Sequence, residues 1–180
     1  MLKVLTDKQI ENLINAPDCR TRQGRRNKAL LSILIYGGLR IAEVCNLKRD
    51  EIQIKDSQIR LTFAGKGGRV RTVTLPIKAT ESVLKHMQKA TSDYLFAGRS
   101  GPLSPRSGHF IVCSYAKKIG LPDWVHPHSL RHTYGTKIMR ETGDIFLVSR
   151  VLGHADISTT AKYYLAYDPS YADKAAEVWK

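Results

Sequence analysis

The strongest constraint on the fold of this chain is a change in the period of its hydrophobic residues. Between Ile52 and Thr74 they recur at every second position, as in half-buried strands, whereas on either side they recur every three or four positions, as in amphipathic helices. Three short strands are therefore expected, near 52–54, 59–63 and 70–74. The sequence predicts an α+β domain that is mainly α-helical, with a small three-stranded antiparallel sheet.

Capping signals and glycines mark where the expected elements begin and end. Thr6 to Gln9 has the form of a capping box, which starts the first helix. Gly37 and Gly38 stop the second helix, because glycine readily adopts the left-handed conformation at a helix C-terminus. The glycine-rich segment 65–68 suits a hairpin turn between the last two strands. The expected helices are 7–16, 25–36, 41–47, 77–89, 105–119, 128–141, 144–152 and 158–165.

Length and composition limit the class of protein. The chain has 180 residues, of which 42% are hydrophobic and 25% charged, as in one ordinary globular domain. Its apolar runs are too short to cross a bilayer, and its N-terminus turns polar too early for a secretory signal, so we expect a cytoplasmic protein. Cys19, Cys45 and Cys113 have no C-x-x-C spacing, and neither a disulfide framework nor a zinc site is expected from them.

The charge of the chain is strongly basic and unevenly distributed. Lys and Arg total 29 against 16 Asp and Glu, a formal net charge of +13, and 13 of the basic but only 5 of the acidic residues lie in 17–75. A domain this basic usually meets a polyanion, and nucleic acid is the first candidate. The alternative is that these charges only solvate exposed faces. The candidate DNA contacts are Arg25, Arg26, Arg69 and Arg71.

Two clusters in the N-terminal half combine glycine with a basic side chain. Arg40 follows Gly37 and Gly38, and Lys66 lies within the glycine-rich segment 65–68. Taken alone, such residues are more often solvated surface groups than functional ones. The alternative is that the glycines let the backbone approach a phosphate, which the guanidinium binds with two donors while the lysine donates a proton.

Two further clusters lie in the C-terminal half. His128 and Arg131 are three residues apart, so they share a helical face, and His154 follows a glycine in a turn after a predicted helix. A lone turn histidine is usually unremarkable. His128 and His132 are four residues apart, which raises a zinc site as a competing interpretation. No H-E-x-x-H glutamate or second ligand pair supports it, and no metal is expected.

Together the four clusters resemble one family, the catalytic domain of the tyrosine recombinases, also called phage integrases. The resemblance covers about residues 6–167. Matches in the same order are more specific than any one of them. The matching segments are G-G-L-R-I-A-E at 37–43, G-K-G-G at 65–68, H-S-L-R-H-T at 128–133, and L-G-H at 152–154, which is followed nine residues later by Tyr163.

This resemblance implies roles for the matching residues. Tyr163, selected over Tyr164 by the nine-residue interval, would attack a DNA phosphodiester and form a 3′-phosphotyrosine. Lys66 would protonate the leaving 5′-oxygen, and Glu43 would orient Arg40 or nearby donors rather than react. The reaction would need no metal, cofactor or ATP. The active-site basic residues would be Arg40, Lys66, His128, Arg131 and His154.

The resemblance also implies the partners and the setting. The partner would be double-stranded DNA at specific recombination sites, bound by a homotetramer that is a monomer without DNA, at the nucleoid of a bacterial, archaeal or phage-infected cell. Residues 1–180 would form the catalytic domain, with no N-terminal core-binding domain, so that the sequence would be either a fragment of a longer recombinase or a minimal member. The tail 168–180 would dock on a neighbouring subunit or on its own domain. The alternatives are a type IB topoisomerase, which relaxes DNA without joining sites, and a non-catalytic DNA-binding module.

Overall fold

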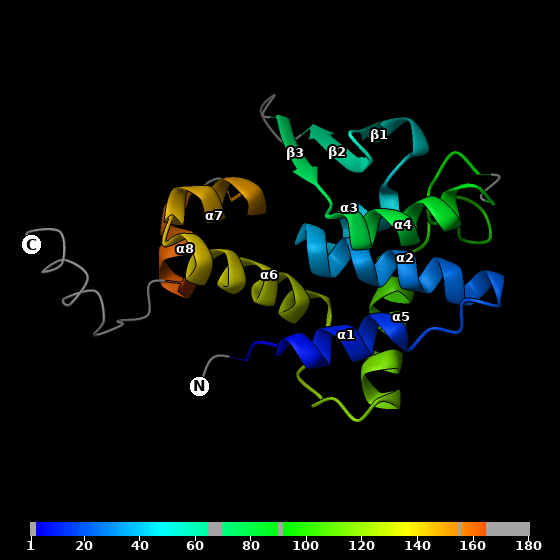
Figure 1. Cartoon of the computed structure of the whole chain (residues 1–180), viewed down its shortest axis with the longest axis horizontal. Helices are drawn as coiled ribbons and strands as arrows, with labels where there is room; N and C mark the ends of the chain where they lie inside the picture. The colour runs from blue at the N-terminus through cyan, green and yellow to red at the C-terminus, as the bar shows by residue number, and fades with distance from the viewer. Residues whose placement is uncertain (1–2, 65–69, 90–91, 155, 165–180) are drawn as a thin grey trace, which may run out of the picture.

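Helices with one small sheet make up the computed structural model, which describes residues 3–64, 70–89, 92–154 and 156–164 (Figure 1). The predicted α+β architecture, mainly helical with a three-stranded antiparallel sheet, is confirmed. In chain order the elements are α1 Asp7–Asn15, α2 Arg22–Gly37, α3 Ile41–Asn46, the 3₁₀ turn Arg49–Glu51, β1 Ile52–Lys55, β2 Gln58–Ala64, β3 Val70–Thr74, α4 Ile77–Met87, α5 Pro105–Lys118, α6 Pro127–Thr142, α7 Ile145–Leu152 and α8 Ile157–Tyr164.

The ends of the helices follow from local capping chemistry. Thr6 forms the expected capping box at the start of α1. The second helix begins at Arg22, earlier than expected, because the Thr21 side chain accepts a hydrogen bond of 2.9 Å from the backbone N–H of Gly24. It ends as expected at the glycine pair, where Gly38 adopts φ of 60°.

The sheet is a meander in which β2 lies between β1 and β3 and pairs antiparallel with both. Asp56 and Ser57 make the turn from β1 to β2 with φ of 51° and 61°. The expected hairpin at 65–68 lies outside the described residues. On the inner face of the sheet the buried side chains are Ile59, Leu61 and Val73.

Within the part of the chain that the structure describes, buried hydrophobic side chains form two separate clusters. The larger one surrounds α2, whose residues from Ala29 to Ile35 are all buried. The smaller one consists of Met139, Val148 and Leu152 between α6 and α7. We call α6, α7 and α8 the C-terminal unit; they lie together at one end of the described structure (Figure 1). This unit meets the rest of the domain mainly where α6 packs on α2 and α7 packs on β3.

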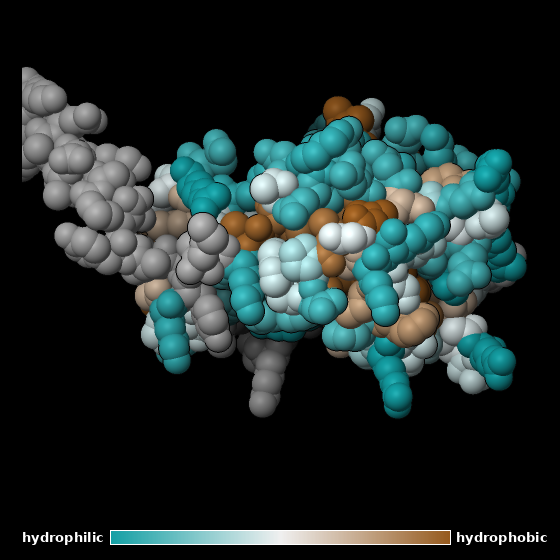
Figure 2. Space-filling view, turned by 90° about the horizontal axis from the view of Figure 1, so that it is seen from below, coloured by the Kyte–Doolittle hydropathy of each residue, from teal (hydrophilic) through white to brown (hydrophobic). Residues whose placement is uncertain are grey.

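One face of the described structure is predominantly hydrophilic. In the view of Figure 2, hydrophilic side chains cover most of the described face and hydrophobic ones gather near its middle. The most exposed of the large hydrophobic side chains are Val70, Phe110 and Phe146. No helix within the described ranges has the length and hydropathy needed to cross a membrane.

Candidate active site

The turn between α2 and α3 presents Arg40. Gly38 precedes it in the left-handed conformation, and a Cβ on Gly38 would lie 2.2 Å from Cδ1 of Tyr134 on α6. Only glycine therefore fits this position, on both backbone and packing grounds. Arg40 is the N-cap residue of α3, and its side chain is 50% exposed. The Arg40 guanidinium is therefore half exposed beside the α2–α6 contact, where a ligand can reach it.

Glu43 accepts hydrogen bonds that stabilise this turn. One carboxylate oxygen accepts hydrogen bonds from the Arg40 backbone N–H at 2.7 Å and from the Arg71 guanidinium at 2.9 Å. The other oxygen accepts one from the Arg40 guanidinium at 3.2 Å. Burial opposes ionisation of Glu43, but the Arg40 backbone N–H and the Arg71 charge outweigh it and lower the pKa of the carboxyl group. Glu43 is therefore an ionised support for two arginines.

Arg131 lies on α6 and is buried, with 5% of its surface exposed. Its guanidinium donates to the carbonyl of Gly38 at 2.7 Å and to the carbonyl of Leu152 at 2.5 Å. These carbonyls lie at the C-terminal ends of α2 and α7, where helix carbonyls lack partners within the helix and carry partial negative charge. The two helix ends thereby stabilise a cation inside the protein.

Arg71 lies on β3 and was expected among the DNA contacts. The structure places its guanidinium inside the domain, with 12% of the side chain exposed. The guanidinium donates to Glu43 and, at 2.5 Å, to the same Leu152 carbonyl that Arg131 uses. It also lies over the ring of Phe63, 5.4 Å from the ring centroid. Its contacts are thus with the protein itself.

His154 follows α7 in the turn that Gly153 opens with φ of 65°. Its Nδ1 lies 2.8 Å from the hydroxyl of Thr160, which is fully buried. Burial and nearby positive charge lower the pKa of His154 to about 4, so the imidazole is neutral at pH 7. The charges that add to this effect are those of Arg131, Arg40, Arg71 and His128. The structure therefore brings His154 into the same positive environment as the predicted arginines.

His128 lies in the first turn of α6 and is exposed. Its ring stacks on that of His126, with centroids 6.4 Å apart, and His126 stacks in turn on His109 at 6.2 Å. Burial, and then the neighbouring imidazoles of His128 and His109, lower the pKa of His126. The stack restricts the directions in which the His128 ring can point.

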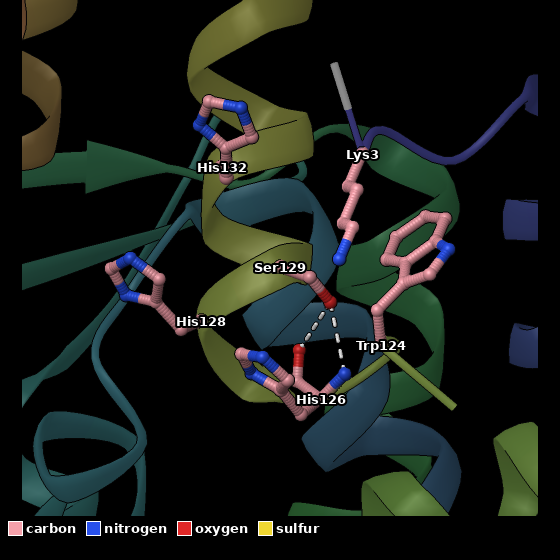
Figure 3. A pocket seen from close by; sticks show the side chains of 6 residues that line it. All are labelled: Lys3, Trp124, His126, His128, Ser129 and His132. Carbon is pink, nitrogen blue, oxygen red and sulfur yellow. Dashed lines mark hydrogen bonds between the residues drawn. The ribbon is translucent and has the colours of Figure 1, made fainter. Parts of the chain in front are cut away.

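A pocket lies beside these imidazoles. In Figure 3, Lys3 and Trp124 stand on one side of α6 and His128 on the other. Ser129 closes the N-terminus of α6, because its hydroxyl donates to the carbonyl of His126 at 2.7 Å and accepts from the N–H of the same residue at 2.9 Å. The pocket is lined by Lys3, Trp124, His126, His128, Ser129 and His132.

Across the described ranges, no three His, Cys, Asp or Glu side chains are arranged to hold a metal ion.

Of the remaining predicted catalytic residues, the structure describes only the backbone of Tyr163. Lys66 and Arg69 lie outside the described residues, as does the tail 168–180. The backbone of Tyr163 lies in α8, the helix that also carries Thr160. Its side chain is outside the described part of the structure.

Arg25 and Arg26 lie in the first turns of α2, whereas Arg40 follows its end. At 1.5 Å per residue, about 20 Å of helix separates them from Arg40. The Arg25 guanidinium donates to the carbonyls of Cys19 and Arg20. Arg25 and Arg26 therefore do not share the site around Arg40.

Three groups in this site were not singled out from the sequence. Two are backbone carbonyls, those of Gly38 and Leu152, which no side-chain pattern reveals. Their signal is indirect, since a glycine that ends a helix leaves carbonyls without partners. The third is Thr160, which the sequence shows as one of two adjacent threonines in a short helix; only burial distinguishes it from Thr159, which is exposed.

Comparison with known proteins gives the family of the chain. Residues 3–170 match the model of the phage integrase family. The chain belongs to this family. Its tyrosine recombinase relatives include XerA of Pyrococcus horikoshii, 35% identical over 170 residues, and XerC of Bacillus licheniformis, 32% identical over 172 residues. Each alignment covers 89% of this chain and 56% of the relative, so this chain spans just over half the length of these relatives.

Solved structures support the same family and fold. The XerH site-specific recombinase bound to its difH substrate, in a pre-cleavage complex, is 25% identical and superposes with a TM-score of 0.84. That match covers 99% of this chain and 55% of XerH. The XerA recombinase is 28% identical with a TM-score of 0.77, covering 97% of this chain and 64% of XerA. The tyrosine recombinase catalytic fold, expected from the sequence motifs, is confirmed.

Proposed function

We propose that this protein is a site-specific DNA recombinase that cleaves and rejoins DNA strands through a covalent 3′-phosphotyrosine. One observation carries the proposal. Arg40, Arg131 and His154 come from three separate segments of the chain. Arg131 donates hydrogen bonds to the carbonyls of Gly38 and Leu152, which lie two residues before Arg40 and two before His154, and the charges of both arginines lower the pKa of His154. Two permanent cations with a neutral imidazole donor beside them suit one phosphate in a transition state that carries extra negative charge.

Two permanently charged arginines fit this task better than lysines would. A guanidinium is planar and presents donors in a fork that matches two phosphate oxygens. Arg40 and Arg131 would stabilise the non-bridging oxygens of the pentacoordinate transition state. The neutral imidazole of His154 would donate a hydrogen bond to the same phosphate, while the two arginines supply the positive charge that many phosphoryl-transfer enzymes take from metal ions.

The chemical step transfers the phosphoryl group to Tyr163. The phenol oxygen attacks phosphorus in line, and its proton passes to His128. The bond from phosphorus to the 5′-oxygen breaks, and Lys66 donates the proton that this oxygen needs. The products are a 3′-phosphotyrosine ester and a free 5′-hydroxyl. Because the phosphoester is conserved, the 5′-hydroxyl of another strand can reverse the step without ATP.

The proposed partner is double-stranded DNA. XerH was solved bound to its difH substrate, and this chain has a net charge of +13. Strand exchange joins two DNA sites, and we infer a homotetramer on paired sites, acting on nucleoid DNA in the cytoplasm. Arg25, Arg26 and Arg69 remain candidate contacts to DNA outside the reacting phosphate.

Trapping of the covalent intermediate tests this proposal. The protein is incubated in EDTA with a pool of suicide duplexes that carry a nick and randomised arms, so that the released 5′-hydroxyl fragment diffuses away and cleavage cannot reverse. Wild-type protein should form a protein–DNA adduct that survives a denaturing gel, and sequencing of the trapped DNA should give the site. Tyr163→Phe should form none, whereas the matched variant Tyr164→Phe should retain the adduct.

Two results would contradict the proposal. An adduct that persists in Tyr163→Phe would remove the nucleophile assigned here, and the absence of any wild-type adduct would remove the reaction. A supercoiled plasmid carrying two copies of the selected site separates the class of enzyme. Rearranged circles are expected, whereas relaxation alone would identify a type IB topoisomerase.

A further inference from the structure

We propose that Arg71 is a positioning residue of the active site, which holds the C-terminal unit in register with the α2–α3 turn. This inference rests on the proposed function. Arg71 would not touch the DNA or the reacting atoms. It would act through Glu43 on one side and through the Leu152 carbonyl on the other, and so set where Arg40, Arg131 and His154 stand relative to one another.

The guanidinium of Arg71 joins two parts of the molecule that are far apart in sequence. One terminal nitrogen donates to Glu43 at 2.9 Å and the other to the Leu152 carbonyl at 2.5 Å. The first partner belongs to the turn that presents Arg40, and the second to the helix end that precedes His154. A planar fork with donors in fixed directions can hold two such acceptors at once, which a lysine ammonium on a flexible stem cannot do equally well.

Arg131 completes a closed circuit with these contacts. It donates to the Leu152 carbonyl, which it shares with Arg71, and to the carbonyl of Gly38. Glu43 in turn accepts from the backbone N–H of Arg40, two residues beyond Gly38. This circuit starts and ends in the same turn and passes through both guanidinium groups. We call it the polar circuit; its members are Gly38, Arg40, Glu43, Arg71, Leu152 and Arg131. Moving any one member displaces the others.

The division of the core explains why such a circuit matters. Among the described residues, α6 contributes Leu130 to the main core, whereas α7 packs on α6 through a separate cluster of three buried hydrophobic side chains and meets the sheet at β3. Apolar packing is non-directional and permits small sliding motions of one unit on the other. Buried charged hydrogen bonds have fixed geometry, and their loss leaves a costly unpaired group. The polar circuit thus fixes the position of α7 relative to the α2–α3 turn, which the small cluster between α6 and α7 does not fix by itself.

Local packing reserves the space that Arg71 occupies. A Cβ on Gly153 would lie 2.2 Å from a terminal nitrogen of Arg71. Phe63, on the neighbouring strand, covers the guanidinium with its ring face. The glycine of the L-G-H segment therefore does more than end α7: it admits the Arg71 side chain to the Leu152 carbonyl.

The competing role for Arg71 is a contact to a DNA phosphate, and the two roles predict different kinetics. A phosphate contact contributes to affinity and to its salt dependence, so its loss weakens binding and lowers the salt slope by about 1. A positioning residue acts on the reacting geometry, where a displacement of about 1 Å can cost roughly 100-fold in rate. The two roles can therefore be separated by measuring cleavage at saturating DNA.

The test uses the trapped suicide duplex and three proteins: wild type, Arg71→Gln, and Arg140→Gln as a control that removes one exposed positive charge from the end of α6. In single-turnover cleavage at saturating DNA, Arg71→Gln should be slower by roughly 10- to 100-fold. Its dissociation constant for DNA should stay within about 3-fold of wild type, with an unchanged salt slope. Arg140→Gln should cleave at the wild-type rate.

A second readout follows His154 directly. The charge of Arg71 helps to lower the pKa of this imidazole. In an NMR titration without DNA, Arg71→Gln should therefore raise the pKa of His154, and Arg140→Gln should leave it unchanged. Because Arg71→Lys keeps the charge and loses only the fork, a change of the His154 pKa in that variant reports displacement of the imidazole, whereas a residue that only stabilised the fold would leave this titration unchanged.

The outcomes separate this inference from the proposed function. A wild-type protein that forms no adduct contradicts the function itself. A wild-type adduct, with Arg71→Gln cleaving at the normal rate or losing only affinity and salt slope, overturns the positioning role and leaves the function standing. If Arg71→Gln fails to fold, Arg71→Lys replaces it. This variant keeps the charge but not the fork, so a loss of about 10-fold is expected, and wild-type cleavage by it would overturn the inference.

Discussion

At the scale of single residues, His154 is the most strongly perturbed functional group. Its Nδ1 faces the Thr160 hydroxyl, and three arginines with His128 surround it with positive charge. In a neutral imidazole only one ring nitrogen carries a proton, and the hydrogen bond that one nitrogen makes decides which of the two it is. If the threonine hydroxyl donates to Nδ1, the proton lies on Nε2, which can then donate to a phosphate oxygen. The neighbours of His154 thus prepare it as a donor rather than as a cation.

The first prediction concerns the titration of His154. We expect an NMR titration of the free protein to give a pKa of about 4 for its imidazole, with the proton on Nε2 at pH 7. The imidazole takes up a proton near pH 6.5 in the unfolded state but only near pH 4 in the folded state. The contribution of this group to stability is therefore complete above about pH 6.5 and declines as the pH falls toward 4.

DNA should reverse part of this shift. A bound phosphate is an anion, and it favours the charged imidazole, so the pKa of His154 should rise when Tyr163→Phe protein is titrated with an intact duplex carrying the selected site. Thr160→Val removes the hydroxyl that faces Nδ1, so the proton of His154 should no longer be confined to Nε2. The exposed control Thr159→Val should leave the proton on Nε2. A normal pKa near 6.5 in the free protein, or no change on adding DNA, would contradict this description of the site.

At the scale of elements, glycines in left-handed conformation end α2, α6 and α7. They do not all have the same function. Gly38 lies against the ring of Tyr134, and Gly153 lies against Arg71, whereas a Cβ on Gly143 would meet no atom within 4 Å. The first two allow the close approach of segments that build the site, and the third only ends a helix.

The second prediction compares two of these glycines. Gly143→Ala should lower the free energy of unfolding by about 1–2 kcal/mol, the cost of a left-handed alanine. Gly38→Ala bears the same strain and also sets its Cβ 2.2 Å from Tyr134, so a further loss of about 1–3 kcal/mol is expected. Urea unfolding of both variants measures the difference. Equal losses would mean that the α2–α6 contact yields without cost.

The same elements show what a sequence can and cannot reveal here. The change of hydrophobic period identified the three strands, and the glycine pair identified the end of α2, because both signals are local. Arg71 was predicted from its charge to face DNA, but its surroundings come from α3 and α7, which no local pattern connects to β3. The Leu152 carbonyl is invisible for the same reason, since its role depends on which cations the fold delivers to a helix end.

At the scale of the whole molecule, the buried hydrophobic side chains of the described ranges form one large and one small cluster. The helix α2 is buried along most of its length in the large one, whereas α7 depends on the small cluster formed by Met139, Val148 and Leu152. Phe146 and Leu147 of α7 are exposed. A unit with few buried apolar contacts opens at lower free energy than the core does. The catalytic geometry therefore includes the part of the domain with the smaller core.

The third prediction follows from this division. In native-state hydrogen exchange, the amides of α7 should exchange through a local opening well below the free energy of global unfolding, and the central amides of α2 only through global unfolding. Arg71→Gln should speed exchange in α7 and leave α2 unchanged, because it cuts the polar circuit but not the main core. A bound duplex should slow exchange in α7, since its phosphate draws His154 and both arginines to one point. Exchange of α7 at the rate of α2 in the free protein would show that the two clusters behave as one cooperative core, and that the arginines are not needed to hold them in register.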